Sequence, residues 1–285
     1  MKKILLTGAD GMLAHDFIQS QKGKFEIIPY NKSSLDIMDI YQIEQRVKES
    51  MADIIVNCAA YTNVDEAEGN ERKINSDINT LGVLNIATVA HKYQKDFITL
   101  STDYVFDGTK KGGYNEGDTK NPLNNYGLAK SLGENLAQET HPNTIIVRTS
   151  WLYGGGKDYK NFVNTMLKLS ETRNELRVIN DQFGSPTYTG DLSEAIGKVI
   201  ENIGDFRGNI LQLSGTTPEN GMTWFDFASE IFKMTGKKIQ LIPCTSAEYV
   251  TKAIRPKYSK MRNNSSVQMR DWKEGLREYL RGKLI

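Results

Sequence analysis

The sequence predicts an α/β protein with a doubly wound parallel sheet and a smaller C-terminal domain. Patterns typical of strand and helix alternate from the N-terminus to residue 150, which is the rhythm of a parallel sheet with helices on both faces. The run at residues 53–60 is apolar enough to be buried on both sides, as inner strands of such a sheet are. A glycine-rich turn between the first expected strand and the first expected helix completes the pattern.

The expected elements follow from hydrophobic periodicity and from the turns that bound each segment. Strands are expected at residues 3–6, 25–30, 53–60, 96–100, 144–148, 176–179, 209–213 and 239–242. Helices are expected from the glycine turn to about residue 21, after Ile37 to about residue 50, at 75–93, 126–140, 161–172, 192–200 and 223–234, and from residue 271. The loop that ends at Pro122 is expected to lie over a site, and the basic stretch 252–262 to be irregular.

These elements suggest two domains. Residues 1–150 form the sheet domain, which is Rossmann-like, and segments within about 175–212 are expected to return to it. Residues 151–174 and 213–285 then form a lid on the carboxyl edge of the sheet, with a cleft between the lid and the sheet.

Composition narrows the classes of function. The chain has 285 residues, enough for one large domain or two modest ones, and its 36 basic residues nearly balance its 35 acidic residues. This balance argues against nucleic acid or an anionic membrane as a partner. The first apolar run breaks at Thr7, too early for a signal peptide, and no run approaches the length of a membrane span. Cys58 and Cys244 lack metal-type spacing, which fits a reducing, cytoplasmic setting.

The turn after the first strand has the form of a dinucleotide-binding fingerprint. It reads TGADGMLA at residues 7–14. Gly8 permits the tight turn, and Gly11 lets the backbone approach a pyrophosphate at the helix N-terminus, where unpaired N–H groups favour anions. Ala14 is small enough for close packing of the helix on the strand. The turn therefore predicts a bound dinucleotide, with an ordinary strand-to-helix turn as the alternative.

The end of the second strand bears on which dinucleotide binds. An NAD site usually has an acidic residue here for the ribose 2′-hydroxyl, whereas this chain has YNKSS at residues 30–34. The ammonium of Lys32 and the neighbouring hydroxyls suit a 2′-phosphate, so we expect NADPH to be used at least as well as NADH. A solvated turn is the alternative reading of Lys32.

Two further segments carry groups suited to carbonyl reduction. Thr102 and Asp103 follow the apolar run 96–100, at the carboxyl end of an expected strand. Tyr126 and Lys130 are four residues apart and share one face if their segment is helical. A hydroxyl can orient a carbonyl oxygen, a phenol can protonate it, and a nearby cation can lower the pKa of that phenol. By itself, the Tyr–Lys pair fits an exposed helix face better than a catalytic pair.

Seven motifs lie along the chain in register. They are TGADGMLA, NCAAYTNVDEAE, STDYVFDG, NNYGLAK, RTSWLYG, NDQFGSPT and RPKYSKM. Together they resemble the extended short-chain dehydrogenase/reductases and, within them, the dTDP-4-dehydrorhamnose reductases. The resemblance covers nearly the whole chain, and seven motifs in order are far more specific than the Tyr–Lys pair alone.

The resemblance implies a role for each matching residue. Thr102, Tyr126 and Lys130 would be catalytic, with Tyr126 as the proton donor. Cofactor contacts would come from Gly8, Asp10, Gly11, Met12, Leu13, Lys32, Asp36, Ile37, Ala59, Ala60, Tyr61, Asn79, Tyr126 and Lys130. Substrate contacts would come from Thr102, Asp103, Trp151, Asn161, Gln182 and Arg255. The alternatives are a core position for Trp151 and a solvated charge for Arg255.

The resemblance also implies a reaction. NADPH, or NADH in its place, would reduce the C4 ketone of dTDP-4-dehydro-β-L-rhamnose to dTDP-β-L-rhamnose, the last step of dTDP-L-rhamnose biosynthesis. The protein would be a monomer or a homodimer. Some family members bind Mg²⁺ through acidic residues at a dimer contact, and Asp16 and Asp191 fall near such positions. Aspartate replaces glutamate there, so the metal stays an open question.

Two other functions remain as alternatives. The first is a related nucleotide-sugar epimerase or reductase, such as a GDP-sugar epimerase-reductase, which commonly needs a cysteine and a histidine on the substrate side. Cys58 and the three histidines of the chain match that need poorly. The second is a non-catalytic regulatory subunit of a methionine adenosyltransferase. The intact Thr102, Tyr126 and Lys130 argue against it, because a binding module does not need all three.

Overall fold

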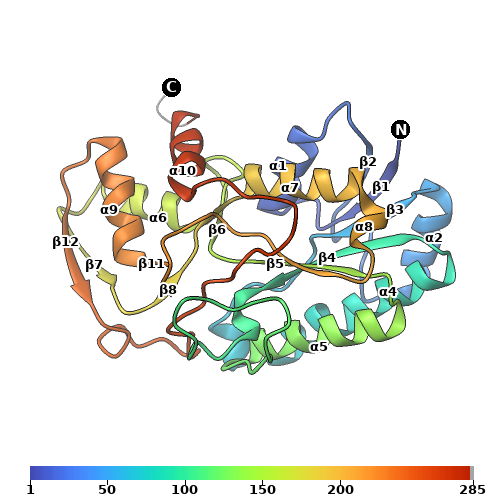
Figure 1. Ribbon diagram of the computed structural model, residues 1–285, viewed down its shortest axis with the longest axis horizontal. Helices are drawn as coiled ribbons and strands as arrows, with labels where there is room; N and C mark the ends of the chain where they lie inside the picture. The colour runs from blue at the N-terminus through green and yellow to red at the C-terminus, as the bar shows by residue number, and fades with distance from the viewer. Residues whose placement is uncertain (283–285) are drawn as a thin grey trace.

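A parallel sheet of six strands lies at the centre of the computed structural model, which describes residues 1–282 (Figure 1). Its order is β10-β5-β4-β3-β1-β2. The strands are β1 (Lys3–Thr7), β2 (Glu26–Tyr30), β3 (Ile54–Asn57), β4 (Asp96–Thr102), β5 (Ile145–Thr149) and β10 (Ile210–Gln212). The order reverses at β1, because β2 and β3 pair with opposite sides of it. Such a reversal is where doubly wound sheets bind ligands, and it confirms the predicted fold class.

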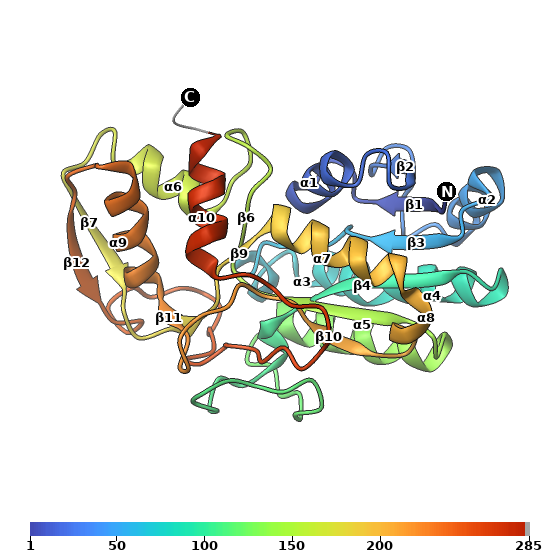
Figure 2. The ribbon, with the colours of Figure 1, turned by 45° about the horizontal axis from the view of Figure 1, so that its top comes forward.

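Helices cover both faces of the sheet (Figures 1 and 2). One face carries α1 (Met12–Ser20), α7 (Thr189–Glu201) and α8 (Ile203–Phe206), and the other carries α2 (Ile40–Ser50), α4 (Val83–Lys92) and α5 (Asn125–Thr140). Alternate residues of β1 divide between these layers: Ile4 and Leu6 pack with the first set, and Leu5 packs with the second. Burial on both faces explains why these strands read as continuous apolar runs.

A smaller group of elements with its own core continues directly from the carboxyl end of β5 (Figure 2). It contains β6 (Leu152–Tyr153), α6 (Phe162–Leu169), β7 (Glu175–Ile179), β8 (Phe183–Gly184), β9 (Thr187–Tyr188), β11 (Met222–Thr223), α9 (Trp224–Thr235), β12 (Gln240–Cys244) and α10 (Trp272–Arg281). The basic stretch 252–262 is irregular, as predicted. Along the described chain, no helix is long and apolar enough to cross a membrane.

The expectation that the strand at 176–179 returns to the main sheet is wrong. This strand, β7, pairs with β12 in a separate two-stranded sheet. Its residues alternate between exposed and buried, whereas β3 is buried throughout. One buried face is what a sheet at the surface requires, so β7 has no place inside the main sheet. The later segments do return, because α7 packs against α1 and β10 pairs with β5. The exact domain limits stay a prediction.

Two elements differ in detail from the expected pattern. The helix expected at 75–93 is present, but it consists of α3 (Arg72–Ser76), a π-helical turn η2 (Asp77–Gly82) and α4. The strand expected at 53–60 ends at Asn57, whose side-chain oxygen accepts from Ala59 N at 3.1 Å and from Thr7 Oγ1 at 2.6 Å. The short 3₁₀ turns η1 (Glu66–Glu68) and η3 (Asp103–Val105) complete the elements.

A buried ion pair fixes α5 to the sheet. Arg148 on β5 donates through Nε and Nη2 to the two carboxylate oxygens of Glu134, at 2.9 and 2.8 Å. Both side chains are 1% exposed. Lys120 adds a third contact to Glu134 at 3.0 Å. Because α5 also carries Tyr126 and Lys130, this pair sets the position of both residues relative to β4 and β5.

We expect Glu134→Gln to lower the free energy of unfolding by about 3–5 kcal/mol, because Arg148 would keep a buried charge without its carboxylate. Thermal and urea unfolding would measure the loss. Glu139→Gln, at an exposed position of the same helix, is the matched control and should change stability by less than about 0.5 kcal/mol. Equal stability of the two variants would contradict a structural role for the pair.

Candidate active site

The glycine turn between β1 and α1 lies at the point where the strand order reverses. Gly8 has a φ of +69°, and a Cβ added there would lie 2.6 Å from the backbone nitrogen of Ala59. Gly11 begins α1 without a side-chain cap, and its N–H donates to Gly8 O at 2.9 Å. The first N–H groups of α1 are thus free to bind an anion. The glycine turn forms a cradle around them, and larger residues at Gly8 and Gly11 would fill this cradle with side chains. These residues fit the pyrophosphate of a dinucleotide.

The end of β2 lies beside this turn, as the fingerprint requires. Ala9 N donates to Tyr30 O at 3.1 Å, and Asn31 Nδ2 donates to Asp10 Oδ1 at 3.4 Å. Lys32 is exposed and directly follows Asn31, the residue that contacts Asp10 of the glycine turn. The structure thus brings the expected cofactor residues Asp10 and Lys32 into one region. The contact of Lys32 with a 2′-phosphate stays a prediction.

Two expected cofactor residues lie on the loop between β2 and α2. The Asp36 carboxylate accepts from Met38 N at 2.9 Å, which turns the loop. Ile37 is buried, and a Cβ added at Gly82 of the π-helical turn would lie 2.6 Å from its Cδ1. Gly82 therefore lets this loop lie directly against the long helix.

Asn79 holds the segment that follows β3. Its Nδ2 donates to Tyr61 O at 2.9 Å, and its Oδ1 accepts from Tyr61 N at 3.2 Å. Its Nδ2 also donates to Asn75 Oδ1 at 2.8 Å, and the side chain is 1% exposed. The π-helical turn presents Asn79 to this segment, which carries Ala59 and Ala60. Any effect of Asn79 on cofactor binding would act through the backbone it holds.

The three predicted catalytic residues come together at the carboxyl end of β4. Thr102 is its last residue, and Tyr126 and Lys130 lie one turn apart on α5. The Thr102 hydroxyl lies near enough to the Tyr126 phenol to favour its ionised form. Lys130 Nζ donates to Leu100 O at 2.5 Å, so it sits beside the same strand. The start of α5 is pressed onto η3, because a Cβ at Gly127 would lie 2.1 Å from Tyr104 O.

Burial dominates the titration of these groups. It raises the pKa of Tyr126 to about 12, with the Thr102 hydroxyl opposing the shift and the charge of Asp103 adding to it. Burial also lowers the pKa of Lys130 to about 8, against the opposing charge of Glu134. Burial thus sets the net direction for this phenol, and stabilisation of its phenolate by Lys130 stays a prediction. At neutral pH, Tyr126 carries its proton and Lys130 is mostly charged.

Asp103 is a buried carboxyl group at the same strand end. It is 2% exposed, and Thr102 Oγ1 donates to its Oδ1 at 3.1 Å. Burial raises its pKa to about 7, while the hydroxyls of Ser259 and Thr102 oppose the shift. A carboxyl group with such a raised pKa beside a phenol and a hydroxyl is typical of functional sites.

The expected substrate residues have their own structural partners. Trp151 has a left-handed backbone, with a φ of 47°, and its ring stacks on Trp224 with 3.5 Å between centroids. Asn161 caps α6 by accepting from Asn164 N at 2.9 Å. Gln182 is buried and donates to Ser246 Oγ at 3.0 Å. Their contacts with a substrate stay predictions.

Arg255 belongs to the irregular stretch 252–262. It is not the solvated charge that the sequence left open as an alternative. Its guanidinium group donates to both carboxylate oxygens of Asp65, at 3.1 and 2.8 Å. It also donates to Ala253 O at 3.0 Å, and its side chain is 18% exposed. Arg255 therefore joins residues 252–262 to the segment between β3 and η1.

Comparison with known proteins identifies the family. The model of the RmlD substrate binding domain matches residues 1–284. The chain belongs to this family. It is 37% identical to the spore coat polysaccharide biosynthesis protein SpsK of Bacillus subtilis, over 98% of this chain and 97% of that one. It is 35% identical to a dTDP-4-dehydrorhamnose reductase of Aggregatibacter actinomycetemcomitans, over 97% and 98% of the two chains. The crystal structure of a dTDP-4-dehydrorhamnose reductase of Bacillus anthracis in complex with NADP superposes with a TM-score of 0.92, at 38% identity over 98% of this chain and 99% of that one.

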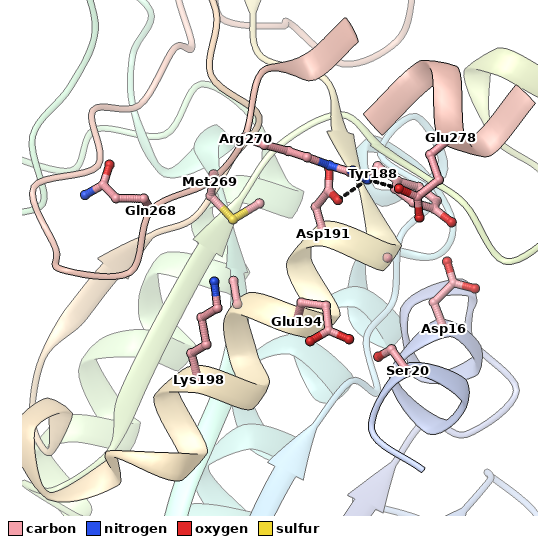
Figure 3. A pocket seen from close by; sticks show the side chains of 12 residues that line it. Asp16, Ser20, Tyr188, Asp191, Glu194, Lys198, Gln268, Met269, Arg270 and Glu278 are labelled. Carbon is pink, nitrogen blue, oxygen red and sulfur yellow. Dashed lines mark hydrogen bonds and ion pairs between the residues drawn. The ribbon is translucent and has the colours of Figure 1, made fainter. Parts of the chain in front are cut away.

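The acidic residues expected near a Mg²⁺ site of this family are satisfied by protein donors. The Asp16 carboxylate accepts from Gly155 N at 3.0 Å and from the hydroxyl of Thr189. Arg270 Nη2 lies 2.5 Å from Asp191 Oδ1 and 2.6 Å from Glu278 Oε2, between the two carboxylates. Figure 3 shows this guanidinium group in the position where a cation would join the two acids.

These residues do not fit a bound magnesium ion. A hollow of about 400 Å³ lies at this place, lined by Asp16, Ser20, Tyr188, Gly190, Asp191, Glu194, Ala195, Lys198, Gln268, Met269, Arg270 and Glu278 (Figure 3). Within residues 1–282, no group of three or more His, Cys, Asp or Glu side chains is arranged to hold a metal ion. Arg270 already supplies the positive charge that these acids need. None of the three predicted catalytic residues lines the hollow.

Sequence reasoning missed the residues that hold the expected ones in place. Tyr104 packs edge-on against Tyr126, with 5.9 Å between ring centroids. Asp65 holds Arg255, and Trp224 supports Trp151. Tyr104 and Asp65 lie inside two of the seven motifs, and this position was the only hint of their importance in the sequence. Trp224 could not be found in this way, because its partner Trp151 is 73 positions earlier in the chain.

We expect EDTA to leave both catalytic turnover and the melting temperature unchanged. Added MgCl₂ should change turnover by less than about twofold, because an ion that does not bind the protein cannot shift its stability or activity. Steady-state rates and thermal unfolding of the dialysed protein would test this. Loss of activity in EDTA that Mg²⁺ restores would overturn the assignment of Arg270 as the internal cation.

Proposed function

We propose that this protein is a reductase that uses NADPH to reduce the C4 ketone of dTDP-4-dehydro-β-L-rhamnose to dTDP-β-L-rhamnose. The observation that carries the proposal is the meeting of Thr102, Tyr126 and Lys130 at the end of β4, on the same edge of the sheet as the glycine cradle at the reversal point. Relatives named dTDP-4-dehydrorhamnose reductase match nearly the full chain, and the NADP complex of the Bacillus anthracis protein supports the choice of cofactor.

The residues of the chain account for the proton and the orientation of the sugar. When bound, the cofactor supplies the hydride. Tyr126, which is protonated at neutral pH, donates its proton to the oxygen at C4 as negative charge develops there. The Thr102 hydroxyl, already in contact with Tyr126, hydrogen-bonds the same oxygen and fixes the ketone. Lys130 is the buried cation that stabilises the phenolate left behind.

The raised pKa of Tyr126 suits the direction of the reaction. A phenol that must give up a proton is useful only while it carries one, and burial keeps it protonated across the neutral range. The same burial holds the pKa of Lys130 near 8, so rising pH would remove the positive charge before it removes the phenol's proton. Turnover is therefore expected to fall on the alkaline side with the loss of charge on Lys130.

Neither alternative function has a structural feature in its favour. Burial raises the pKa of Cys58 to about 12, so its thiol is a poor acid or base for an epimerase. A regulatory subunit would not need the Thr102, Tyr126 and Lys130 cluster in working geometry. Reduction of a nucleotide-linked ketosugar is the function that uses every part of the site.

We expect the purified protein to oxidise NADPH when dTDP-4-dehydro-β-L-rhamnose is added, and NADH no faster. The free ketosugar should react poorly even at high concentration, because binding energy from the nucleotide positions C4 for reaction, so its loss lowers kcat as well as KM. Absorbance at 340 nm measures the rate, and chromatography identifies the product. Equal rates with the free sugar would rule out a nucleotide-sugar substrate.

We expect Tyr126→Phe to lower kcat by about 10²-fold or more, the usual scale for loss of a general acid, while cofactor affinity stays unchanged. Tyr41→Phe is the matched control, since Tyr41 lies on α2 and is 81% exposed. Fluorescence titration with NADPH separates binding from turnover. Near-normal turnover in a folded Tyr126→Phe protein would exclude Tyr126 as the proton donor.

A further inference from the structure

Residues 252–262, here called the strap, cross the catalytic segment at the end of β4. Tyr258 N donates to Gly108 O at 3.1 Å, and a Cβ added at Gly108 would lie 2.5 Å from Lys257 N. The Ser259 hydroxyl lies near the buried Asp103 carboxyl group and opposes the rise in its pKa that burial causes. The strap therefore lies directly on the residues that follow Thr102.

One carboxylate on the cofactor side of the molecule holds the beginning of the strap. Asp65 precedes η1, and its two oxygens accept from both Nη atoms of Arg255. Its Oδ1 also accepts from Ala253 N at 3.0 Å. The hydrogen bond with Arg255 is the largest cause that lowers the pKa of Asp65. Asp65 thus binds the strap through a side chain and through the backbone at once.

The held end of the strap contacts the helix that carries the catalytic tyrosine. Asn124, the N-cap of α5, donates through Nδ2 to Ile254 O at 2.8 Å. The Arg255 guanidinium group also lies close enough to the Tyr104 phenol to favour its ionised form, and that ring packs edge-on against Tyr126. A chain of contacts therefore runs from Asp65 through Arg255 and Tyr104 to Tyr126.

We propose that Asp65 is a positioning residue of this site: it holds Arg255 and the strap closed over the catalytic segment, so that the nucleotide end of the substrate meets an arginine that is already oriented. The inference rests on the proposed function for its substrate. A planar guanidinium group fixed by a carboxylate loses little freedom when it binds a diphosphate, which favours binding. If the strap were released, part of the binding energy of the substrate would be spent on closing it.

A neighbouring ion pair offers a matched control. Lys252 Nζ lies 2.7 Å from Glu66 Oε1, one residue from Asp65, and also joins the strap to this segment. These side chains are 59% and 38% exposed, whereas Arg255 is 18% exposed. An exposed pair contributes little, so removal of the Glu66 charge tests for a general effect of charge on this surface.

The experiment compares Asp65→Asn with Glu66→Gln. The amide of Asn offers one acceptor oxygen where the carboxylate offers two, so it cannot hold the guanidinium fork. We expect Asp65→Asn to lower kcat/KM for dTDP-4-dehydro-β-L-rhamnose about tenfold, mainly through KM, because a smaller fraction of the protein is closed. Glu66→Gln should stay within about twofold of wild type, and both variants should bind NADPH as wild type does.

A double variant tests whether Asp65 acts through Arg255. If it does, Asp65→Asn combined with Arg255→Ala is no slower than Arg255→Ala alone, because the contact is already lost. Multiplicative losses would overturn the proposal, and so would an Asp65→Asn protein with wild-type KM. A drop in NADPH affinity that matches the drop in kcat/KM would also overturn it, since that indicates general damage to the fold.

A second measurement does not depend on the substrate. Limited trypsin digestion should cleave after Lys257 several-fold faster in Asp65→Asn than in Glu66→Gln, because the released strap is open for a larger fraction of the time. Equal cleavage rates would overturn the proposal. If the wild-type protein has no reductase activity, the proposed function fails, while this digestion still decides whether Asp65 holds the strap.

Discussion

The buried ion pair between Arg148 and Glu134 is the constraint on which the site depends. It joins a strand of the sheet to the helix that carries Tyr126 and Lys130, and it does so where both side chains are 1% exposed. A buried pair of this kind is costly to break and adds little net stability compared with apolar packing, so its value here is the fixed position it gives to α5. Glu134 also opposes the effect of burial on Lys130 by favouring its charged form.

The long helix before β4 gives the cofactor side a matching constraint. Its π-helical turn places Asn79 against the backbone of Tyr61 and brings the backbone of Asn79 so close to α5 that a Cβ at Gly133 would lie 2.2 Å from its oxygen. The same helix therefore holds both the segment after β3 and the catalytic helix. Wide turns of this kind are frequent at functional sites, where they move a side chain out of the regular helical register.

The sequence allowed the sheet and the meeting of Thr102 with Tyr126 and Lys130 to be predicted, because their signals are local. A strand buried on both faces reads as an apolar run, and the Tyr126–Lys130 spacing already places two groups on one helix face. The strand β7 and the side chain of Asp65 could not be placed in this way. The pairing of β7 with β12 spans more than 60 residues, from Glu175 to Gln240 at the first register position. Asp65 gains its role only when residues 252–262 fold back onto it, and no local pattern encodes that contact.

The stack of Trp151 on Trp224 has a consequence for spectroscopy. The chain has three tryptophans, and two of them lie face to face at 3.5 Å with 7° between their planes. Trp151 follows β5, Trp224 opens α9, and both rings pack against the core of the smaller group of elements. Two indoles at this spacing interact electronically, so the near-ultraviolet circular dichroism and the intrinsic emission of the protein report whether that smaller core is packed, without any added label.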